Sequence, residues 1–272
     1  MNRIDALFVR LAREGRKALM PFLTAGDPDL ATTSALIAEM VRRGADMIEV
    51  GIPYSDPIAD GPVIAASYNR ALRGGVKLDG IFEAIRAIRF KYDATPMVAM
   101  VSFAIIHRRG VDRFLGDARG SGFDGLIVPD LPVEESESLG RLAEGAGLKL
   151  IQLITPTTPR DRALAIARST TGFIYYVSVA GITGERRSLP PELAANVAWL
   201  RSRTDLPICI GFGIGTPDQV RDLAPVADGL IVGSALVRRL EGAQGRPEGE
   251  LIREVGQFIA DLAGGFGPKA GG

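Results

Sequence analysis

Short apolar runs alternate with longer helical patterns along almost the whole chain, and this alternation limits the folds that the chain can adopt. Eight runs have the length of buried strands, and they span residues 18–23, 46–51, 96–101, 125–128, 149–154, 172–177, 207–211 and 229–232. An amphipathic helix at 4–14 precedes the first run, and further helical patterns lie at residues 29–43, 78–91, 111–120, 133–146, 159–169, 191–203, 217–223, 234–240 and 250–262. Most runs are apolar throughout, which is typical of parallel strands that are covered on both faces.

Eight strand and helix pairs in about 250 residues fit an α/β fold, the closed (β/α)8 or TIM barrel, here with an additional N-terminal helix. An open doubly wound sheet is the alternative, and it would normally carry a Gly-x-Gly-x-x-Gly turn after its first strand. The first run ends in LTAGDP instead, at residues 23–28. No linker or shift in composition divides the chain, so we predict one domain over residues 1–263 and a disordered tail at 264–272.

Composition argues against several classes of function. The chain has 32 lysines and arginines and 32 aspartates and glutamates, and a net charge of zero disfavours nucleic acid or an anionic membrane as the main partner. No apolar run is long enough to span a bilayer, and the first residues lack the apolar core of a signal peptide, so we expect a cytoplasmic protein. With one cysteine and one histidine, neither a disulfide nor a metal site is expected. Catalysis would depend on carboxylates, tyrosines and backbone groups.

The most informative stretch is residues 49–62, EVGIPYSDPIADGP, where a carboxylate lies in an apolar run and further acids follow in a loop. Period-two alternation places Glu49 and Gly51 on one face of the strand and predicts that Glu49 is buried. A buried carboxylate needs partners or keeps its proton at neutral pH, and either outcome suits acid–base chemistry. A purely structural carboxylate at the strand end is the alternative. The prolines that stiffen the loop and its unpaired acids, Asp56 and Asp60, favour an active site.

In a parallel barrel the chemistry lies on the loops that follow the strands. After the sixth run, residues 178–187 are rich in small residues and predict a mobile flap, and alternation directs either Tyr175 or Tyr176 into the barrel mouth. The seventh and eighth runs end in glycine turns, GFGIG at 211–215 and GSA at 233–235, and each turn leads into a helix start. Free N–H groups at such turns can form an anion site, so we favour phosphate binding there over plain tight turns.

These motifs together resemble the α subunit of tryptophan synthase over nearly the whole chain. Residues 49–62 carry the most specific match, and supporting matches are PFLTAGDP at 21–28, VPDLPVEE at 128–135, PTTP at 156–159, GITG at 181–184 and the two glycine turns. The resemblance implies a barrel that cleaves indole-3-glycerol phosphate to indole and glyceraldehyde 3-phosphate by a retro-aldol reaction, in the last steps of tryptophan biosynthesis. It also implies a β-subunit partner in an αββα heterotetramer, with pyridoxal phosphate only in that partner and no cofactor in this chain.

The same resemblance implies roles for particular residues. Glu49 would be the general acid and base, Asp60 would accept from the indole N–H and stabilise the positive charge that develops there, and Tyr175 would be the supporting hydroxyl. The indole ring would contact Phe22, Ile64, Met100 and Phe212. The phosphate and the flap that closes over it would involve Thr183, Gly184, Gly213, Gly233 and Ser234. The β subunit would contact Pro53, Asp56, Pro57, Ala104, Asp130 and Pro132.

The chain departs from the family pattern after the third run, where the family usually reads Met-x-Tyr-x-Asn-Pro and this chain has Met100-Val-Ser102-Phe-Ala104-Ile105. Ala65 stands where the family often places a glutamine. Ser102 would enlarge or hydrate the indole pocket, and Ala104 removes a side chain that in the family lies near the β subunit. The catalytic residues are intact, so the departures put only the docking of the partner in question.

Three other functions stay open on the sequence alone. Another phosphate-binding barrel, such as a ring-closing synthase or an isomerase, would need a catalytic lysine near a strand end, and the strand-end motifs carry none. A non-catalytic subunit that only activates a β-type partner is disfavoured by the intact Glu49, Asp60 and Tyr175. A lyase that releases free indole without a partner is the third alternative, and Ala104 favours it.

Overall fold

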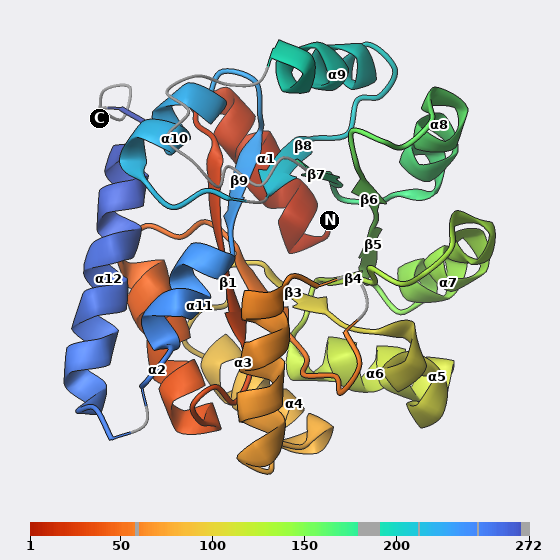
Figure 1. The fold of residues 1–272 in the computed structure, drawn as a ribbon. Coiled ribbons are helices and arrows are strands. Elements are labelled where there is room, and N and C mark those ends of the chain that lie inside the picture. The colour runs from red at the N-terminus through yellow and green to blue at the C-terminus, as the bar shows by residue number, and fades with distance from the viewer. Residues whose placement is uncertain (58–59, 179–190, 212, 244, 268–272) are drawn as a thin grey trace.

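The computed structural model describes residues 1–57, 60–178, 191–211, 213–243 and 245–267. Within these residues nine parallel strands form one sheet that curves into a nearly closed barrel (Figure 1). The strands are β1 (Ala18–Thr24), β2 (Ile48–Gly51), β3 (Met97–Met100), β4 (Gly125–Ile127), β5 (Lys149–Ile151), β6 (Leu153–Ile154), β7 (Ile174–Val177), β8 (Ile208–Gly211) and β9 (Gly229–Val232). Their order in the sheet is β5-β4-β3-β2-β1-β9-β8-β7-β6, so neighbours in sequence are neighbours in space. The predicted barrel is confirmed.

The fifth predicted strand is interrupted at Gln152, which explains why the structure has nine strands where the sequence predicts eight. β5 pairs with β4, and β6 pairs with β7. Around the break, the carbonyl of Gln152 accepts a hydrogen bond from the N–H of Tyr175 (3.1 Å), and that of Leu150 accepts one from Thr171 (2.9 Å). Residues 149–154 therefore pair with β4 through β5 and with β7 through β6, and they connect the two ends of the sheet.

Helices surround the barrel, and most of them lie where the sequence predicts them (Figure 1). They are α1 (Arg3–Arg13), α2 (Leu30–Arg42), α3 (Pro62–Arg73), α4 (Leu78–Arg89), α5 (Phe103–Arg109), α6 (Val111–Ser121), α7 (Val133–Gly145), α8 (Arg160–Ser169), α9 (Pro191–Arg201), α10 (Pro217–Leu223), α11 (Ser234–Leu240) and α12 (Glu248–Gly264). Two of these, α3 and α5, add to the predicted set. Proline is favoured at the first position of a helix, and Pro62 begins α3 directly after the acidic loop. Among the described residues, no helix has both the length and the apolar character needed to cross a membrane.

Two layers of apolar side chains stabilise the barrel. The outer layer lies between the strands and the helices and includes Ile48. The inner layer fills the barrel and includes Met47, and α1 packs against it where the rings of Phe8 and Phe173 lie 5.8 Å apart. Because alternate residues of a strand point to opposite faces, Glu49 points into the barrel together with Met47, as the sequence predicts.

The predicted tail begins at the end of the last helix. α12 ends at Gly264, and the partly buried Phe266 still packs against the outer apolar layer. Residues 268–272 lie outside the described part of the chain.

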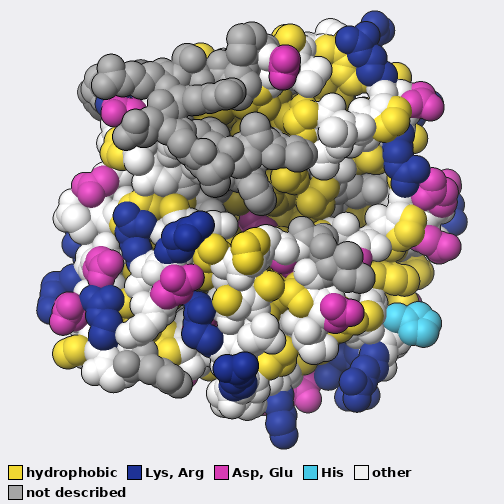
Figure 2. All heavy atoms as spheres, viewed as in Figure 1, with side chains coloured by type: hydrophobic (Ala, Val, Ile, Leu, Met, Phe, Trp, Pro, Cys, Tyr) yellow, Lys and Arg dark blue, Asp and Glu magenta, His cyan; other side chains and the backbone are white. Residues whose placement is uncertain are grey.

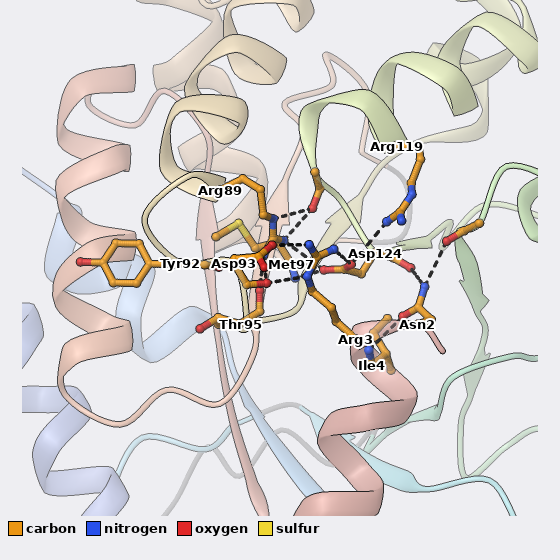
Figure 3. A network of polar contacts seen from close by, with 12 residues as sticks. Asn2, Arg3, Ile4, Arg89, Tyr92, Asp93, Thr95, Met97, Arg119 and Asp124 are labelled. Carbon is orange, nitrogen blue, oxygen red and sulfur yellow. Dashed lines mark hydrogen bonds and ion pairs between the residues drawn. The ribbon is translucent and has the colours of Figure 1, made fainter.

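A network of charged side chains joins α1 to the N-terminal ends of β3 and β4 (Figure 3). Asp124 directly precedes β4 and is fully buried, and its carboxylate accepts hydrogen bonds from Arg3, Arg89 and the Met97 N–H, each 3.0 Å long. The side-chain amide of Asn2, which also caps α1, donates to the carbonyl of Asp124 (2.9 Å). A buried charge is tolerated when it is paired and hydrogen-bonded, and Asp124 meets both conditions. The network therefore fastens α1 across this end of the barrel.

Asp124→Ala should lower the free energy of unfolding by about 3 kcal/mol, because it leaves the Arg89 guanidinium and the Met97 N–H without their buried partner. The measurement is urea denaturation followed by circular dichroism. Asp93→Ala is the matched control: it removes another carboxylate that pairs with Arg3, but the Asp93 side chain is 80% exposed, and exposed ion pairs contribute little. Equal losses in the two variants would show that burial does not determine what Asp124 contributes.

Candidate active site

One cavity at the C-terminal ends of the strands collects most of the residues that the sequence analysis selects for catalysis and substrate binding. Those that line it are Phe22, Glu49, Asp60, Ile64, Met100, Tyr175, Gly233 and Ser234. The rest of the described lining consists of Gly61, Pro129, Leu153 and Val177. In Figure 2, hydrophobic side chains gather around a hollow near the centre of the view, and acidic side chains are visible within it. The cavity is thus mainly apolar, with a few polar groups that converge on it.

Glu49 lies on β2 and is 1% exposed, and neither of its carboxylate oxygens has a hydrogen-bond partner among the described residues. Burial, and to a smaller extent the charge of Asp60, raises the pKa of Glu49 from its ordinary value of 4.5 to about 8. At neutral pH Glu49 is therefore mostly a protonated carboxylic acid. A structural carboxylate at a strand end would accept backbone hydrogen bonds, so these unpaired oxygens favour the catalytic interpretation over the structural one.

Asp60 reaches the same cavity from the loop between β2 and α3, where its N–H donates to the carbonyl of Pro57 (3.4 Å). Burial raises the pKa of Asp60 from 3.8 to about 6, and the charge of Asp130 adds to the rise. Asp60 is therefore largely ionised at neutral pH while Glu49 keeps its proton. Two carboxyl groups whose environments separate their pKa values can serve as an acid and a base in one site.

β7 brings Tyr175 to the cavity, while Tyr176 points the other way into the outer apolar layer. Burial, followed by the charges of Glu49 and Asp60, raises the pKa of Tyr175 well above 10. Its hydroxyl therefore keeps its proton and can donate a hydrogen bond. The ring lies against β8 at Gly211, where an added Cβ atom would collide with it, so a glycine is required there to leave room for Tyr175.

The two predicted phosphate turns differ in how they are placed. After β8, Gly213 has a φ of +78°, a conformation that favours glycine, and it lies outside the described lining of the cavity. The N–H of Gly215 in this turn donates to the side chain of Gln219 (2.8 Å), so it already has a partner. After β9, Gly233 and Ser234 line the cavity where α11 begins. The turn after β9 is therefore the better placed of the two for an anion.

Part of the predicted site is not described. Thr183, Gly184 and Phe212 lie outside the described residues, and so does most of the predicted flap. Ser178, where the predicted flap begins, is buried at the end of β7. The roles that the resemblance implies for Thr183, Gly184 and Phe212 stay predictions.

A second cavity adjoins the first, and the two share Asp60, Met100 and Pro129. The other residues of its lining are Tyr54, Asp56, Pro57, Tyr68, Val101, Ser102 and Asp130. The Ser102 hydroxyl donates to Asp130 (2.6 Å) and accepts from the Ala104 N–H (3.2 Å), which caps α5. Ser102 therefore shapes the second cavity and not the cavity that contains Glu49.

The six residues that are predicted to meet a β subunit differ in exposure. Three of them line the second cavity: Asp56, Pro57 and Asp130. Two are exposed at the starts of helices: Ala104 on α5 and Pro132 before α7. Pro53 is buried, so it can support such a surface only from beneath.

Sequence analysis missed one large side chain at the site, Tyr68. It lies on α3, and because this helix was not among the predicted elements, its residues could not be assigned to a face. A signal was present, since Ile64, Tyr68 and Ala71 are four and three residues apart, which is the spacing of one helix face. Pro129 and Leu153 were missed as well, although Pro129 follows β4 and Leu153 lies near the end of the fifth predicted strand, where a barrel places its lining.

Glu49 should make the stability of the protein fall as the pH rises. Between the unfolded pKa near 4.5 and the folded value of about 8, the folded chain holds a proton that the unfolded chain has released, so the free energy of unfolding decreases across this window. The expected slope from this residue is about 1.4 kcal/mol per pH unit within the window. Urea denaturation at pH 5, 6, 7 and 8 measures it. Glu49→Gln should flatten the slope, and an identical slope in both proteins would contradict the raised pKa.

Comparisons with known proteins agree with this geometry. The model of the family described as "Tryptophan synthase alpha chain" matches residues 8–261. A tryptophan synthase alpha chain from Rhodopirellula baltica is 55% identical over 245 residues, which cover 89% of this chain and 88% of that protein. One from Citrifermentans bemidjiense is 46% identical, covering 97% and 98% of the two chains. A crystal structure of tryptophan synthase subunit alpha from Legionella pneumophila superposes with a TM-score of 0.89 at 35% identity, covering 98% of each chain. The chain belongs to the tryptophan synthase alpha chain family.

Proposed function

We propose that Glu49, Asp60 and Tyr175 carry out the reaction of this family in the cavity described above. As a member of the family the chain is a carbon–carbon lyase of tryptophan biosynthesis, which cleaves indole-3-glycerol phosphate to indole and glyceraldehyde 3-phosphate. The observation that supports these roles best is the pair of buried carboxyl groups in one cavity, with pKa values of about 8 for Glu49 and about 6 for Asp60. One group can give a proton at neutral pH, and the other can hold a negative charge.

The retro-aldol step moves one proton onto the indole ring and one off the glycerol chain. Glu49 gives its proton to C3 of the indole ring, and the ring nitrogen becomes positively charged. The resulting carboxylate then accepts the proton of the adjacent glycerol hydroxyl as the C–C bond breaks, and the bonding electrons return to the ring and neutralise the nitrogen. Asp60 accepts a hydrogen bond from the ring N–H and stabilises the positive charge while it exists. Tyr175 supports the pair as a neutral hydrogen-bond donor.

The apolar and glycine-rich parts of the cavity suit the two ends of this substrate. We place the indole ring between Phe22, Ile64 and Met100, which line the cavity around the carboxyl groups. The phosphate lies at the start of α11, against Gly233 and Ser234. Phe212 at the ring, Gly213 and Gly184 at the phosphate, and Thr183 in the closing flap complete the proposed contacts.

Membership of the family implies a β chain as the partner of this chain. We propose that the assembly is an αββα heterotetramer in the cytoplasm and that residues 1–263 enter it as one barrel domain. Its α–β contact would include Asp56, Pro57, Ala104, Asp130 and Pro132, with Pro53 beneath. Pyridoxal phosphate belongs to the β partner in this proposal, and no step of the α reaction needs a cofactor, a metal, nucleic acid or a membrane.

Glu49→Gln should lower the rate of indole release from indole-3-glycerol phosphate by roughly a hundredfold or more, because the amide keeps the shape of the side chain but cannot exchange a proton. Glycerol 3-phosphate, which lacks the ring, should bind with unchanged affinity. Glu137→Gln is the control, since Glu137 is an exposed residue of α7 whose carboxylate pairs with Arg141 on the same helix. The assignment fails if Glu49→Gln keeps more than about a tenth of the wild-type rate.

Ala104→Asn tests the proposed partner surface. Ala104 is exposed at the start of α5. Where an interface lacks a polar side chain, the group of the partner that would have bound it is either left unpaired or replaced by a compensating change in the partner. We expect strong mutual activation with the β subunit of the same organism and weaker activation of a β subunit whose own α chain carries asparagine at this position. Ala104→Asn should partly reverse that preference. Ala94→Asn is the control: it makes the same exchange at an exposed site before β3 and should leave the partner preference unchanged.

The readout for this surface is a titration of each α variant against both β subunits, with indole release and tryptophan formation followed together. Equal activation of the two β subunits, unchanged by Ala104→Asn, would show that position 104 does not determine partner choice. Full indole release without any β subunit, and no response to either one, would favour a lyase that works alone.

A further inference from the structure

Tyr68 has no role in the mechanism described above, yet it shares the second cavity with Asp60. The two cavities meet at Asp60, Met100 and Pro129, and Tyr68 lines only the second of them. It is 3% exposed, and a tyrosine this deeply buried normally finds a partner for its hydroxyl. Its surroundings indicate which partner that is.

The ring of Tyr68 lies inside the barrel, next to the strand that carries Glu49. It belongs to the inner apolar layer together with Phe22. A Cβ atom added to Gly51 would lie 3.0 Å from Cε1 of Tyr68 and 2.5 Å from the ring of Phe22. Gly51 is on the same face of β2 as Glu49, so the two rings meet at the strand end next to the acid. Tyr68 therefore approaches the C-terminal end of β2 from the side of α3.

Contacts on both sides of Tyr68 hold α3 against the end of β1 and the loop that follows it. The hydroxyls of Ser67 and Thr24 lie 2.6 Å apart, and the guanidinium of Arg70 donates to both carboxylate oxygens of Asp27 (3.0 and 2.7 Å). The Asp27 side chain is 2% exposed and that of Arg70 is 32% exposed, so the carboxylate of this bidentate pair is shielded from water. Because the helix is fixed one residue before Tyr68 and two residues after it, the phenol has little freedom to move away from the cavity.

The environment of Tyr68 keeps its phenol protonated. Burial raises the pKa of Tyr68 well above 10, and the charges of Asp60, Glu49 and Tyr175 add to the rise in that order. Of these three groups, Asp60 is the one that is largely ionised at neutral pH. The Ser102 hydroxyl in the same cavity already donates to Asp130 (2.6 Å). A phenol that keeps its proton near a carboxylate is a suitable hydrogen-bond donor to it.

We propose that Tyr68 is a positioning residue for Asp60: when the substrate is bound, its hydroxyl donates to one carboxylate oxygen and leaves the other to accept the indole N–H. The inference rests on the proposed function, since it assigns Tyr68 to the reaction of the same site. Held in this way, Asp60 is already aimed at the ring nitrogen when positive charge develops there, and it does not have to reorganise. Tyr68 itself touches neither C3 nor the bond that breaks.

Tyr68→Phe tests the proposal, because phenylalanine keeps the ring beside Gly51 and removes only the hydroxyl. A hydrogen bond to a charged group corresponds to a factor of roughly ten to a hundred, so kcat for indole-3-glycerol phosphate should fall about tenfold or more. KM should stay within about twofold, because the effect appears when charge develops in the transition state. The control is Tyr92→Phe, a half-buried tyrosine just after α4, which should cleave like the wild type.

A double-mutant cycle with Asp60→Ala separates positioning from general packing. If Tyr68 acts through the Asp60 carboxylate, Tyr68→Phe should change kcat by less than about twofold once that carboxylate is removed. A second readout needs no turnover: the pKa of the Asp60 carboxyl, followed by NMR with indole bound, should be higher in Tyr68→Phe than in the wild type and unchanged in Tyr92→Phe, because the lost donor stabilised the carboxylate. The proposal would be overturned if Tyr68→Phe lowered kcat by the same factor with and without the Asp60 carboxylate, or if it lowered kcat in neither protein. If the wild-type chain does not cleave the substrate, the proposed function fails, while the titration of the Asp60 carboxyl still decides the role of Tyr68.

Discussion

Parallel pairing of the strands is the constraint on which the site depends. The described strands all run in one direction, so their C-terminal ends open on one rim, and β2, β7 and β9 bring their side chains together there. The register matters as much as the direction. Phe22 of β1 lies opposite Glu49 of β2, and a slip of one residue would turn Glu49 out of the barrel and into the outer apolar layer. The strand pairing therefore sets the geometry of the acid before any loop contributes.

Buried carboxylates at the two ends of the barrel have opposite effects on its stability. Asp124, at the N-terminal ends of the strands, is surrounded by arginines and a backbone N–H, and it adds to stability because each of these groups is paired. Glu49, at the other end, has no partner for either oxygen among the described residues, and it lowers stability wherever it must ionise. Keeping the stabilising network far from the mouth lets the barrel tolerate an unfavourable group where the chemistry needs it.

Sequence patterns predicted the barrel and the inward direction of Glu49, because apolar runs and period-two alternation depend only on which residues must be buried. The break at Gln152 could not be predicted in this way, since it depends on how the closing sheet pairs with two neighbours at once. α3 was missed because its apolar face begins directly after a proline-rich acidic loop, and Tyr68 was missed with it. The two glycine turns also differ in ways that no periodicity reveals: Gly233 and Ser234 line the cavity, whereas the Gly215 N–H in the other turn is bound to Gln219.

The fastening of α1 determines when this helix can dock during synthesis. The side chain of Asn2 binds the carbonyls of Asp124 and Gly147, which lie 122 and 145 residues further along the chain. α1 leaves the ribosome before β4 and β5, so the surface that receives it does not exist until those strands have been made. Until then its apolar face has no permanent cover, and an incomplete sheet or a chaperone has to shield it from other nascent chains. A helix that is translated before the strands therefore docks only after at least five of them have been made.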